Sequence, residues 1–347
     1  MRKTIILALM ICWPMFASAL QVPGDYSTIQ GAIDAGSDGT SITISAGIYA
    51  ENIHYKGKNI TLQSTDPTSA GCVAGTVIDG NDLDSVVTFA GTEGTTCVLN
   101  GFTITDGTGR INKGGGIHGN GTLASIQNCV IYESLASGTY GAGGGIRDCD
   151  GTITGCTIWD NEAARSGGGL ALCDGTISTN TITGNTALFG GGLAYCDGTI
   201  TINTIAENVA ESTLSWKGYG GGLYECDGTI NHNTIVYNRA SRGGGLSKCN
   251  GTIKNSIIWW NQADTNAQLD GCVVPSYTDL MNYTGGTGCI QGDPLFTDYV
   301  MGDFSLTASS PCRDAAEPYL YWDDSLTTPA WVTVQDDQGR YKRGDNQ

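Results

Sequence analysis

The chain has 347 residues, of which 52 are glycine, 15% are charged and 40% are hydrophobic. This apolar content can form a core, so the composition excludes a disordered chain and favours a globular or solenoidal one. The formal net charge of −17 argues against nucleic acid and anionic lipid as partners. It also disfavours an acidic polysaccharide, unless cations bridge the two like charges.

The first 19 residues have the pattern of a secretory signal peptide. Arg2 and Lys3 precede an apolar run from Ile5 to Phe16, and a small-residue cleavage site ends at Ala19. A membrane anchor is the alternative, but the run is short and contains Pro14. We therefore expect cleavage and export, giving a secreted or cell-surface protein without a membrane span.

A short amphipathic helix is the first element expected after the signal. Residues 27–30, STIQ, have the form of a capping box. Ile29 and Ile33 lie four residues apart on one face, and Gly36 can end the helix. Less regular strands follow, bounded by turn residues. We predict them at Ser41–Ser45, Asn59–Gln63, Val77–Ile78, Ser85–Phe89 and Cys97–Thr105.

One block of 23 or 24 residues then recurs from Gly143 to Asn261. Each block has three glycines, Ile or Leu, a cysteine, the string Asp-Gly-Thr-Ile or Asn-Gly-Thr-Ile, a second isoleucine and a closing asparagine. The cysteine spacings are 24, 23, 30 and 23, so one block carries an insertion. The repeated cysteines are Cys149, Cys173, Cys196, Cys226 and Cys249, and the closing asparagines are Asn161, Asn185, Asn208, Asn238 and Asn261.

A fixed period of this length indicates stacked units, none of which can bury its apolar face alone. The apolar runs are short, rich in Ile, Thr and Val, and separated by Gly, Asp and Asn, which is typical of strands and turns. The pattern predicts coils of a parallel β-helix, stacked about 4.8 Å apart. Ile, Leu and Cys would form inward ladders, and the asparagines would stack at a corner, where they tolerate left-handed backbone.

Three groups of segments carry a resemblance to a known superfamily. Residues 26–64, with YSTIQGAIDAG, ITISAGIYAENI and GKNITLQS, resemble the opening of right-handed parallel β-helix proteins of the pectin-lyase-like superfamily. VLNGFTITDG at 98–107 and the GGGI strings are similar to its coil signatures. Residues 293–315, DPLFTDYVMGDFSLTASSPCRDA, resemble the closing segment of many exported bacterial members.

The resemblance implies an all-β fold, a single-stranded right-handed parallel β-helix, or solenoid, with an N-terminal capping helix. The β-helix would span residues 20–290, with its regular coils at 143–261, and a closing segment would follow at 291–347. Such proteins often continue for one more short strand, so we expect the last cap to be incomplete at Gln347. A solenoid needs its open end covered, and the predicted helix near Ile29 would do so.

Twelve cysteines remain after removal of the signal, an even number that invites a disulfide interpretation in an exported chain. The five repeated cysteines would have parallel Cα–Cβ vectors on adjacent coils, which is a poor geometry for bridging. We predict that they form an inward ladder of free thiols. The better candidates for disulfides are Cys72 with Cys97, Cys129 with Cys156, and Cys272 with Cys289.

The catalytic motifs that the resemblance suggests are absent from the sequence. We find neither the Asp-centred motifs and Gly-Arg-x-Trp of pectin methylesterases, nor the paired aspartates and Gly-His of polygalacturonases, nor the Arg-x-Pro-x-x-Arg of pectate lyases. His54, His118 and His232 fall on separate coils without a partner, so we interpret them as surface residues. The catalytic residues, if there are any, stay unknown.

Asp150, Asp174, Asp197 and Asp227 form the most regular polar feature of the blocks. Stacked carboxylates about 4.8 Å apart repel by roughly 1 kcal/mol per pair in water, and by about 3–4 kcal/mol at an effective dielectric of 20. Calcium would relieve this repulsion, because hard cations bind several carboxylate oxygens. The alternative, which we favour, is that Asp-Gly makes the corner turn and that no cofactor is required.

The turns before the glycine triplets are the second candidate site. Their aromatic faces suit sugar rings, their cations suit carboxylates, and an Arg or Lys could act as the base of a lyase. A solvated loop that covers a coil edge is the alternative. The substrate-binding candidates are Arg165, Trp216, Lys217, Tyr219 and Arg242, with Phe189 beside them.

These patterns lead to two main functional hypotheses. The first is an exported, monomeric, non-catalytic protein of the cell surface or matrix that binds polysaccharide or other cell-envelope components. The second is a polysaccharide lyase or hydrolase acting on an acidic polysaccharide. A minor alternative is ice binding, because Thr152-Ile153-Thr154 and its repeats resemble the Thr-x-Thr arrays of ice-binding solenoids, although the array breaks at Asn231 and Lys254.

Overall fold

The computed structural model describes residues 19–213, 215–313, 315–316, 320–321 and 330–331. Residues 1–18 of the predicted signal peptide and most of the chain after Arg313 lie outside the described residues. The predicted incomplete cap at Gln347 lies outside them too. Neither helix in the described part of the chain is long and apolar enough to cross a membrane.

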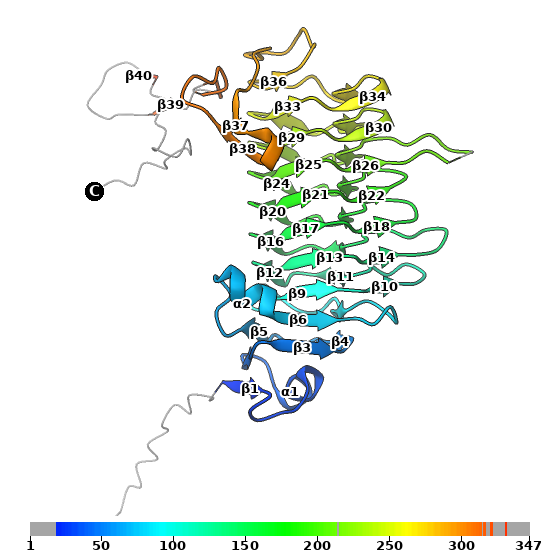
Figure 1. Cartoon of the computed structure of the whole chain (residues 1–347), viewed down its shortest axis with the longest axis vertical. Coiled ribbons are helices and arrows are strands. Elements are labelled where there is room, and N and C mark those ends of the chain that lie inside the picture. The colour runs from blue at the N-terminus through cyan, green and yellow to red at the C-terminus, as the bar shows by residue number, and fades with distance from the viewer. Residues whose placement is uncertain (1–18, 214, 314, 317–319, 322–329, 332–347) are drawn as a thin grey trace, which may run out of the picture.

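The chain forms a rod of four parallel sheets, which we number in the order that a coil visits them after β4 (Figure 1). Sheet 1 contains β1 (Leu20–Val22), β2 (Ser41–Ile44), β5 (Thr61–Ser64), β8 (Val98–Asn100), β12 (Ser125–Gln127), β16 (Thr152–Thr154), β20 (Thr176–Ser178), β24 (Thr199–Thr201), β28 (Thr229–Asn231) and β32 (Thr252–Lys254). Sheet 2 contains β3 (Gly47–Ala50), β6 (Thr76–Asp79), β9 (Thr103–Thr105), β13 (Val130–Tyr132), β17 (Thr157–Trp159), β21 (Thr181–Thr183), β25 (Thr204–Ala206), β29 (Thr234–Val236), β33 (Ile257–Trp259) and β36 (Asp279–Leu280).

The other two sheets are built from shorter strands. Sheet 3 contains β10 (Thr108–Gly109), β14 (Leu135–Ala136), β18 (Glu162–Ala163), β22 (Thr186–Ala187), β26 (Val209–Ala210), β30 (Arg239–Arg242) and β34 (Gln262–Thr265). Sheet 4 contains β4 (Ile53–His54), β7 (Val87–Thr88), β11 (Ile117–Thr122), β15 (Ile146–Cys149), β19 (Leu170–Ala171), β23 (Leu193–Ala194), β27 (Leu223–Tyr224), β31 (Leu246–Ser247) and β35 (Leu269–Asp270). The regular coils therefore pass through sheets 4, 1, 2 and 3 in turn.

The inward ladders predicted from the repeat are confirmed. Ile177 pairs in parallel register with Ile153 on one side and Ile200 on the other, and all three are buried. Ile182 takes the same place in sheet 2. Each isoleucine is one residue of a three-residue strand, so the core is a column of β-branched side chains stacked along the rod axis.

Left-handed residues form the corners of each coil, but they are not the stacked asparagines. In the coil of Asn185, positive φ occurs at Gly167, Leu172, Thr179 and Gly184, between +55° and +65°. Gly184 immediately precedes Asn185, which itself has no positive φ. The expectation of a left-handed asparagine was wrong, because the bend one residue earlier turns the asparagine side chain into the core.

The predicted asparagine stack is present and buried. Asn208 accepts from the backbone N–H and from Nδ2 of Asn185, each at 3.0 Å. Its own Nδ2 donates to the carbonyl of Ile182 at 2.9 Å and to Oδ1 of Asn238 at 3.0 Å. The ladder thus pairs the backbone N–H of Asn185, which lies between β21 and β22, and also binds the carbonyl of Ile182 within β21.

A second buried amide ladder was not predicted. Asn180, Asn203 and Asn233 stack at the corner between sheets 1 and 2, with Asn180 Nδ2 donating to Asn203 Oδ1 at 3.1 Å and Asn203 Nδ2 to Asn233 Oδ1 at 3.0 Å. Cys156 continues this column toward the N-terminus and donates its backbone N–H to Asn180 Oδ1 at 2.8 Å. The column changes residue type along the rod, which hides it in the sequence.

All twelve cysteines from Cys72 to Cys312 are free, so the three predicted disulfides were wrong. The predicted ladder of buried free thiols is confirmed, and Cys272 extends it by accepting the backbone N–H of Cys249 at 3.4 Å. Cys289 instead donates to the Pro275 carbonyl at 3.4 Å, away from that ladder.

The other two predicted pairs fail for different geometric reasons. Cys129 and Cys156 both point inward from adjacent coils, so their Cα–Cβ vectors run parallel, as in the main ladder. Cys72 lies on a short helix that was not predicted, α2 (Ala70–Gly75), where its sulfur contacts the Thr65 hydroxyl at 3.1 Å. Cys97 is buried in the core, and it donates to the carbonyl of Lys58 at 3.6 Å.

The N-terminal end is covered as predicted. Helix α1 (Ile29–Ala35) lies at the end of the rod, with Ile29 and Ile33 fully buried (Figure 1). Its N-cap is Thr28, whose hydroxyl accepts the N–H of Gly31 at 3.0 Å, so the helix begins one residue later than the capping box predicted. Gly36 ends the helix by donating its N–H to Ala32.

The closing segment packs against the side of the rod. Strands β37 (Phe296–Asp298) and β38 (Asp303–Leu306) form an antiparallel hairpin through the 3₁₀ turn η1 (Tyr299–Met301), beside sheet 2 (Figure 1). Phe296 lies 6.0 Å from the ring of Trp260, and Phe304 lies 6.2 Å from that of Tyr237. A separate pair, β39 (Leu320–Tyr321) and β40 (Ala330–Trp331), is also antiparallel.

Asp279 ties this segment to the last coil and should make its attachment depend on pH. The buried carboxylate accepts the N–H of Gly292 at 3.2 Å and the thiol of Cys312 at 2.9 Å, and burial raises its pKa to about 6. An unfolded Asp titrates near pH 3.9, so between about pH 4 and 6 the folded state holds an extra proton. The free energy of unfolding therefore falls as the pH rises through this window.

We expect Asp279→Asn, which is neutral at every pH, to remove this contribution. The difference between the free energy of unfolding of the variant and that of wild type should therefore increase from pH 4 to pH 7. Urea unfolding at both pH values measures this difference. Asp293→Asn is the matched control, because Asp293 lies nearby but is exposed. Parallel pH profiles of wild type and Asp279→Asn would contradict the prediction.

Candidate functional site

The predicted turn residues meet in one strip at the junction of sheets 3 and 4. Ser166, Phe189, Tyr219 and Arg242 pair in parallel, each with the next. Arg165 directly precedes Ser166. Of the five predicted substrate-binding residues, Tyr219 and Arg242 therefore lie in register on adjacent coils, and Arg165 lies one residue before the register position, two coils from Tyr219.

Aromatic rings from sheet 4 complete this strip. The ring of Phe189 stacks on Tyr224 with centroids 5.0 Å apart and lies 6.1 Å from Tyr219. Tyr195 meets Tyr224 edge to face at 5.6 Å. Phe189 and Tyr224 are buried, while Tyr195 and Tyr219 are partly exposed, so buried rings support exposed ones.

Cations border the rings. The Arg165 guanidinium lies 5.5 Å from the ring centroid of Phe189 and 5.7 Å from that of Tyr140, which is 66% exposed. Arg242 lies 5.8 Å from Tyr219, and Lys248 lies 5.7 Å from the same ring. We call the whole set the aromatic–cation surface; its members are Tyr140, Arg165, Phe189, Tyr195, Tyr219, Tyr224, Arg242 and Lys248.

Lys248 is held in its charged form. Its ammonium donates to the Tyr224 hydroxyl at 2.9 Å and to Glu225 at 3.0 Å, and these hydrogen bonds raise the pKa of Lys248 well above its usual value. Burial raises the pKa of Tyr224 to about 12, against the lowering effect of Lys248. At neutral pH the pair is thus a protonated phenol and an ammonium, which can donate hydrogen bonds but cannot accept a proton.

The remaining two predicted residues lie apart from the rings. Trp216, which is 60% exposed, and Lys217 belong to the loop after β26, which projects from the rod (Figure 1). The Thr213 N–H donates to the Trp216 carbonyl at 2.9 Å and closes this loop. The structure therefore places them on the insertion that interrupts the repeat.

Sequence reasoning missed Tyr195, Tyr224 and Lys248, although they occupy fixed places in the repeat. Tyr224 directly follows Leu223, which holds the Ile or Leu position that recurs in each block, and Lys248 directly precedes the repeated Cys249. Neither position holds one constant residue type from block to block, so both looked like unpatterned turn residues.

The aspartate column is ordered by backbone hydrogen bonds. Asp174, Asp197 and Asp227 each donate a backbone N–H to the carboxylate of the preceding coil's aspartate, at 2.8–3.0 Å. The first of these carboxylates belongs to Asp150. In the described part of the chain no three acidic, His or Cys side chains lie close enough together to hold a metal ion. The calcium site stays a prediction.

The expected Asp-Gly corner turn takes a different form. The left-handed residue of that corner is Leu172, two residues before Asp174. Gly175 is needed instead for close approach, because a Cβ there would collide with the backbone of Gly151 in the coil below.

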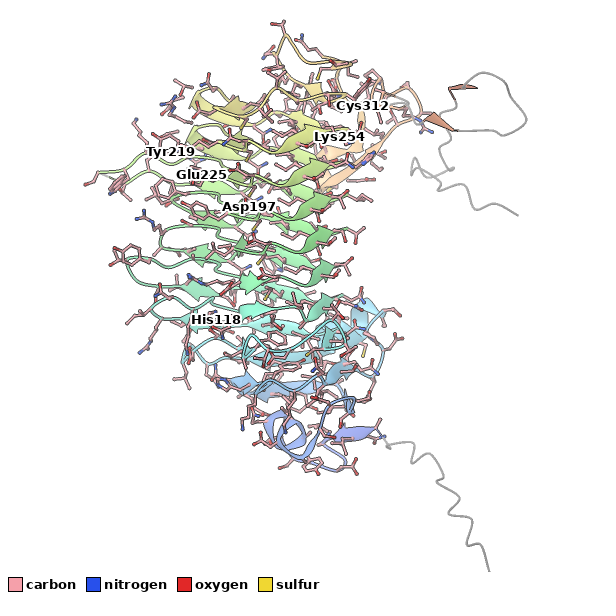
Figure 2. All side chains as sticks on the ribbon, turned by 180° about the vertical axis from the view of Figure 1, so that it is seen from behind. His118, Asp197, Tyr219, Glu225, Lys254 and Cys312 are labelled. Carbon is pink, nitrogen blue, oxygen red and sulfur yellow. The ribbon has the colours of Figure 1, made fainter. Side chains whose placement is uncertain are left out.

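The three histidines differ in exposure. His118 is only 6% exposed, so its prediction as a surface residue was wrong, while His54 and His232 are partly exposed. Burial lowers the pKa of His118 to about 4 and also lowers that of His232. Figure 2 shows His118 on the same side of the rod as Tyr219 and Glu225, several coils closer to the N-terminus.

Two further surface features are a groove over sheet 3 and a threonine array on sheet 1. A groove of about 590 Å³ lies over sheet 3 at the base of the projecting loop, and its polar lining includes Glu211, Arg239 and Asp264. The threonine array lies on sheet 1, where Thr152, Thr176 and Thr199 pair in register and face outward. Ice binding by this array stays a prediction.

Comparison with known proteins finds matches among solved structures. No protein-family model and no curated protein matches this chain. Among solved structures, pectate lyase Pel9A is 15% identical, with a TM-score of 0.47, covering 87% of this chain and 91% of the other. Pectin methylesterase from Aspergillus niger, in deglycosylated form, is also 15% identical, with a TM-score of 0.29 and coverages of 79% and 83%.

The fold assignment rests on the stacked coils themselves. Four parallel sheets with inward isoleucine ladders define a right-handed parallel β-helix, as the repeat predicted. The resemblance noted in the opening, coil and closing segments is confirmed at the level of fold. What the protein does has to be argued from its surface.

Proposed function

We propose that this protein is an exported, non-catalytic β-helix that binds glycans through the aromatic–cation surface, at the cell surface or in a matrix. The observation that carries the proposal is the layer of partly exposed rings backed by buried rings and bordered by Arg165, Arg242 and Lys248. Aromatic faces take up the apolar side of sugar rings, while cations and phenols donate to hydroxyl and carboxylate oxygens. The rigid coils preorganise these groups, which lowers the entropic cost of binding.

The alternative, a polysaccharide lyase acting on an acidic glycan, needs a base that is free to accept a proton. Lys248 is the cation best placed among the rings, and its raised pKa leaves little of it deprotonated at neutral pH. Arginine side chains are protonated at that pH as well. The charge states of the surface thus support binding over proton abstraction.

Titration calorimetry with a panel of neutral and acidic polysaccharides tests the proposal. We expect binding by the wild type and an affinity loss of about tenfold in Tyr219→Ala, equal to about 1.4 kcal/mol, because this variant removes a partly exposed ring that would contact sugar. Trp159→Ala is the matched control, since Trp159 is an exposed ring stacked on Tyr132 at 4.9 Å on sheet 2. This control should bind as wild type does.

Two results would count against binding at this surface. One is no affinity for any member of the panel, and the other is equal loss in Tyr219→Ala and Trp159→Ala. The same samples, followed by ultraviolet absorbance for unsaturated uronate ends and by a reducing-sugar assay, report any lyase or hydrolase activity. Product release by wild type would replace the non-catalytic proposal with the enzymatic one.

A further inference from the structure

Three polar side chains on the outer face of sheet 4 have buried atoms without partners. Thr88, His118 and Arg147 pair in register on β7, β11 and β15. Thr88 Oγ1, His118 Nδ1 and Arg147 Nε are each buried, and none has a hydrogen-bond partner among the described residues. Most buried polar groups in folded proteins are paired, so three such atoms on adjacent strands call for a common explanation.

His118 is the most enclosed of the three. Only 6% of its surface is exposed. Burial lowers the pKa of the imidazole, and the nearby charges of Arg147 and Lys113 lower it further, to about 4. The imidazole is therefore neutral at pH 7 and carries one N–H donor and one acceptor nitrogen. The neutral ring can donate one hydrogen bond to an anion and adds no charge of its own.

Arg147 is a half-buried cation without a counter-ion. In the described part of the chain its guanidinium forms no ion pair, and burial lowers its pKa despite the opposing effect of Asp148. Asp84, the acid that acts on His118, is engaged by Lys113 at 2.6 Å. A partly desolvated guanidinium gains most from an oxyanion, which it can bind through two parallel N–H bonds.

We propose that Thr88, His118 and Arg147 form a binding site for an oxyanion, either a carboxylate or a sulfate or phosphate ester group. The guanidinium provides the charge and the fork of donors, the imidazole provides an N–H, and the threonine hydroxyl donates a third hydrogen bond. Two glycines, Gly114 and Gly143, lie beside the Arg147 side chain. A Cβ on either would come within 2.9 Å of Arg147 Cβ, so a larger residue at either position would displace the arginine side chain.

The site shares a column with the aromatic–cation surface. From Arg147 the outward positions of sheet 4 continue through Ala171 and Ala194 to Tyr224. These are three coil steps, or roughly 14 Å at the usual strand spacing. Both alanines are fully buried, and Ala194 packs with Leu188 and Phe189, so the column between the two sites is not exposed and the two sites are separate.

Anion binding is tested by following the histidine imidazole signals by nuclear magnetic resonance during titration with sodium sulfate, sodium acetate and a simple phosphate monoester. Ionic strength is held constant with sodium chloride, and the signal of His118 is assigned by its loss in His118→Gln. We expect a saturable shift of this signal in wild type. Arg147→Gln should weaken the affinity at least tenfold, because it keeps a polar side chain but removes the charge and the fork of donors.

Arg239→Gln is the matched control, since Arg239 is an exposed arginine on sheet 3, and it should titrate as wild type does. Thr88→Val, which keeps the side-chain shape, provides a second variant if Arg147→Gln does not fold, and it should weaken binding several-fold. The three anions distinguish carboxylate from sulfate and phosphate as the preferred group. No saturable shift in wild type, or equal affinity in the folded variants and wild type, would overturn the site.

The small-anion titration does not depend on the glycan proposal. If sulfate or acetate binds and no polysaccharide does, the oxyanion site stands and the proposed function fails. If a neutral polysaccharide binds through Tyr219 and no anion shifts His118, the reverse holds.

Discussion

Replacing Asn208 with alanine is expected to lower the free energy of unfolding by about 4 kcal/mol. The fully buried amide makes four hydrogen bonds, two accepted from Asn185 and two donated, to Ile182 and Asn238. Alanine leaves these groups buried without partners, and each such group costs about 1–3 kcal/mol. The loss of stability is limited because Asn185 Nδ2 still donates to the carbonyls of Ile158 and Thr183 in the variant.

Urea unfolding followed by far-ultraviolet circular dichroism measures this change. Thr199→Ala is the control on the same coil, because Thr199 is exposed on the outer face of sheet 1, and it should cost less than about 1 kcal/mol. Similar losses in both variants would mean that the amide ladder contributes little and that the stacked apolar columns alone hold the coils together.

The repeat made the core predictable because its period fixes which residues stack. Ile153, Ile177 and Ile200 recur at one place in each block, and equivalent residues in a solenoid must lie one above another. The buried cysteine ladder and the ladder of Asn208 follow from the same argument. The division of each coil into four short strands did not follow, because strands of two residues in sheets 3 and 4 carry no periodic signal of their own.

Corners and pairing of cysteines were harder to predict from the sequence. Left-handed backbone falls on Leu172, Thr179 and Tyr195, residues that rarely adopt it, because the stacked coils above and below impose the bend. Sequence propensity points instead to Asn and Gly. The disulfide prediction failed for a related reason: spacing along the chain does not reveal whether two cysteines, such as Cys72 and Cys97, face the same environment.

The candidate site was predicted in part, and the reason lies in the repeat. Residues in the turns before the glycines, such as Arg165 and Tyr219, stood out as aromatic or charged insertions between constant strings. Residues within the strands, such as His118 and Arg147, occupy the outward position next to an inward Ile or Leu. That position is variable by nature, so a functional residue there is visible only after the sheets are known.

The glycine that follows each aspartate allows adjacent coils to pack closely, and one substitution tests this role. We expect Gly198→Ala to destabilise the protein by more than about 4 kcal/mol and to reduce the yield of folded protein. A Cβ at this position would collide with the carbonyl groups of Gly175 and Asp174 on the adjacent coil. Both are backbone groups within the stack, so the clash can be relieved only by separating coils. The free energy of unfolding in urea is the measurement.

Gly184→Ala distinguishes close approach from backbone conformation as the reason for glycine. Gly184 has a φ of +65°, and an added Cβ would meet only the Asp160 nitrogen, at 3.9 Å. Asp160 and Glu207 occupy the same corner of neighbouring coils with φ of 52° and 58°, so side chains are accepted there. We expect this variant to lose only about 1 kcal/mol, the cost of a left-handed residue. An equal loss at Gly184 and Gly198 would assign the role of these glycines to conformation and not to the packing of one coil on the next.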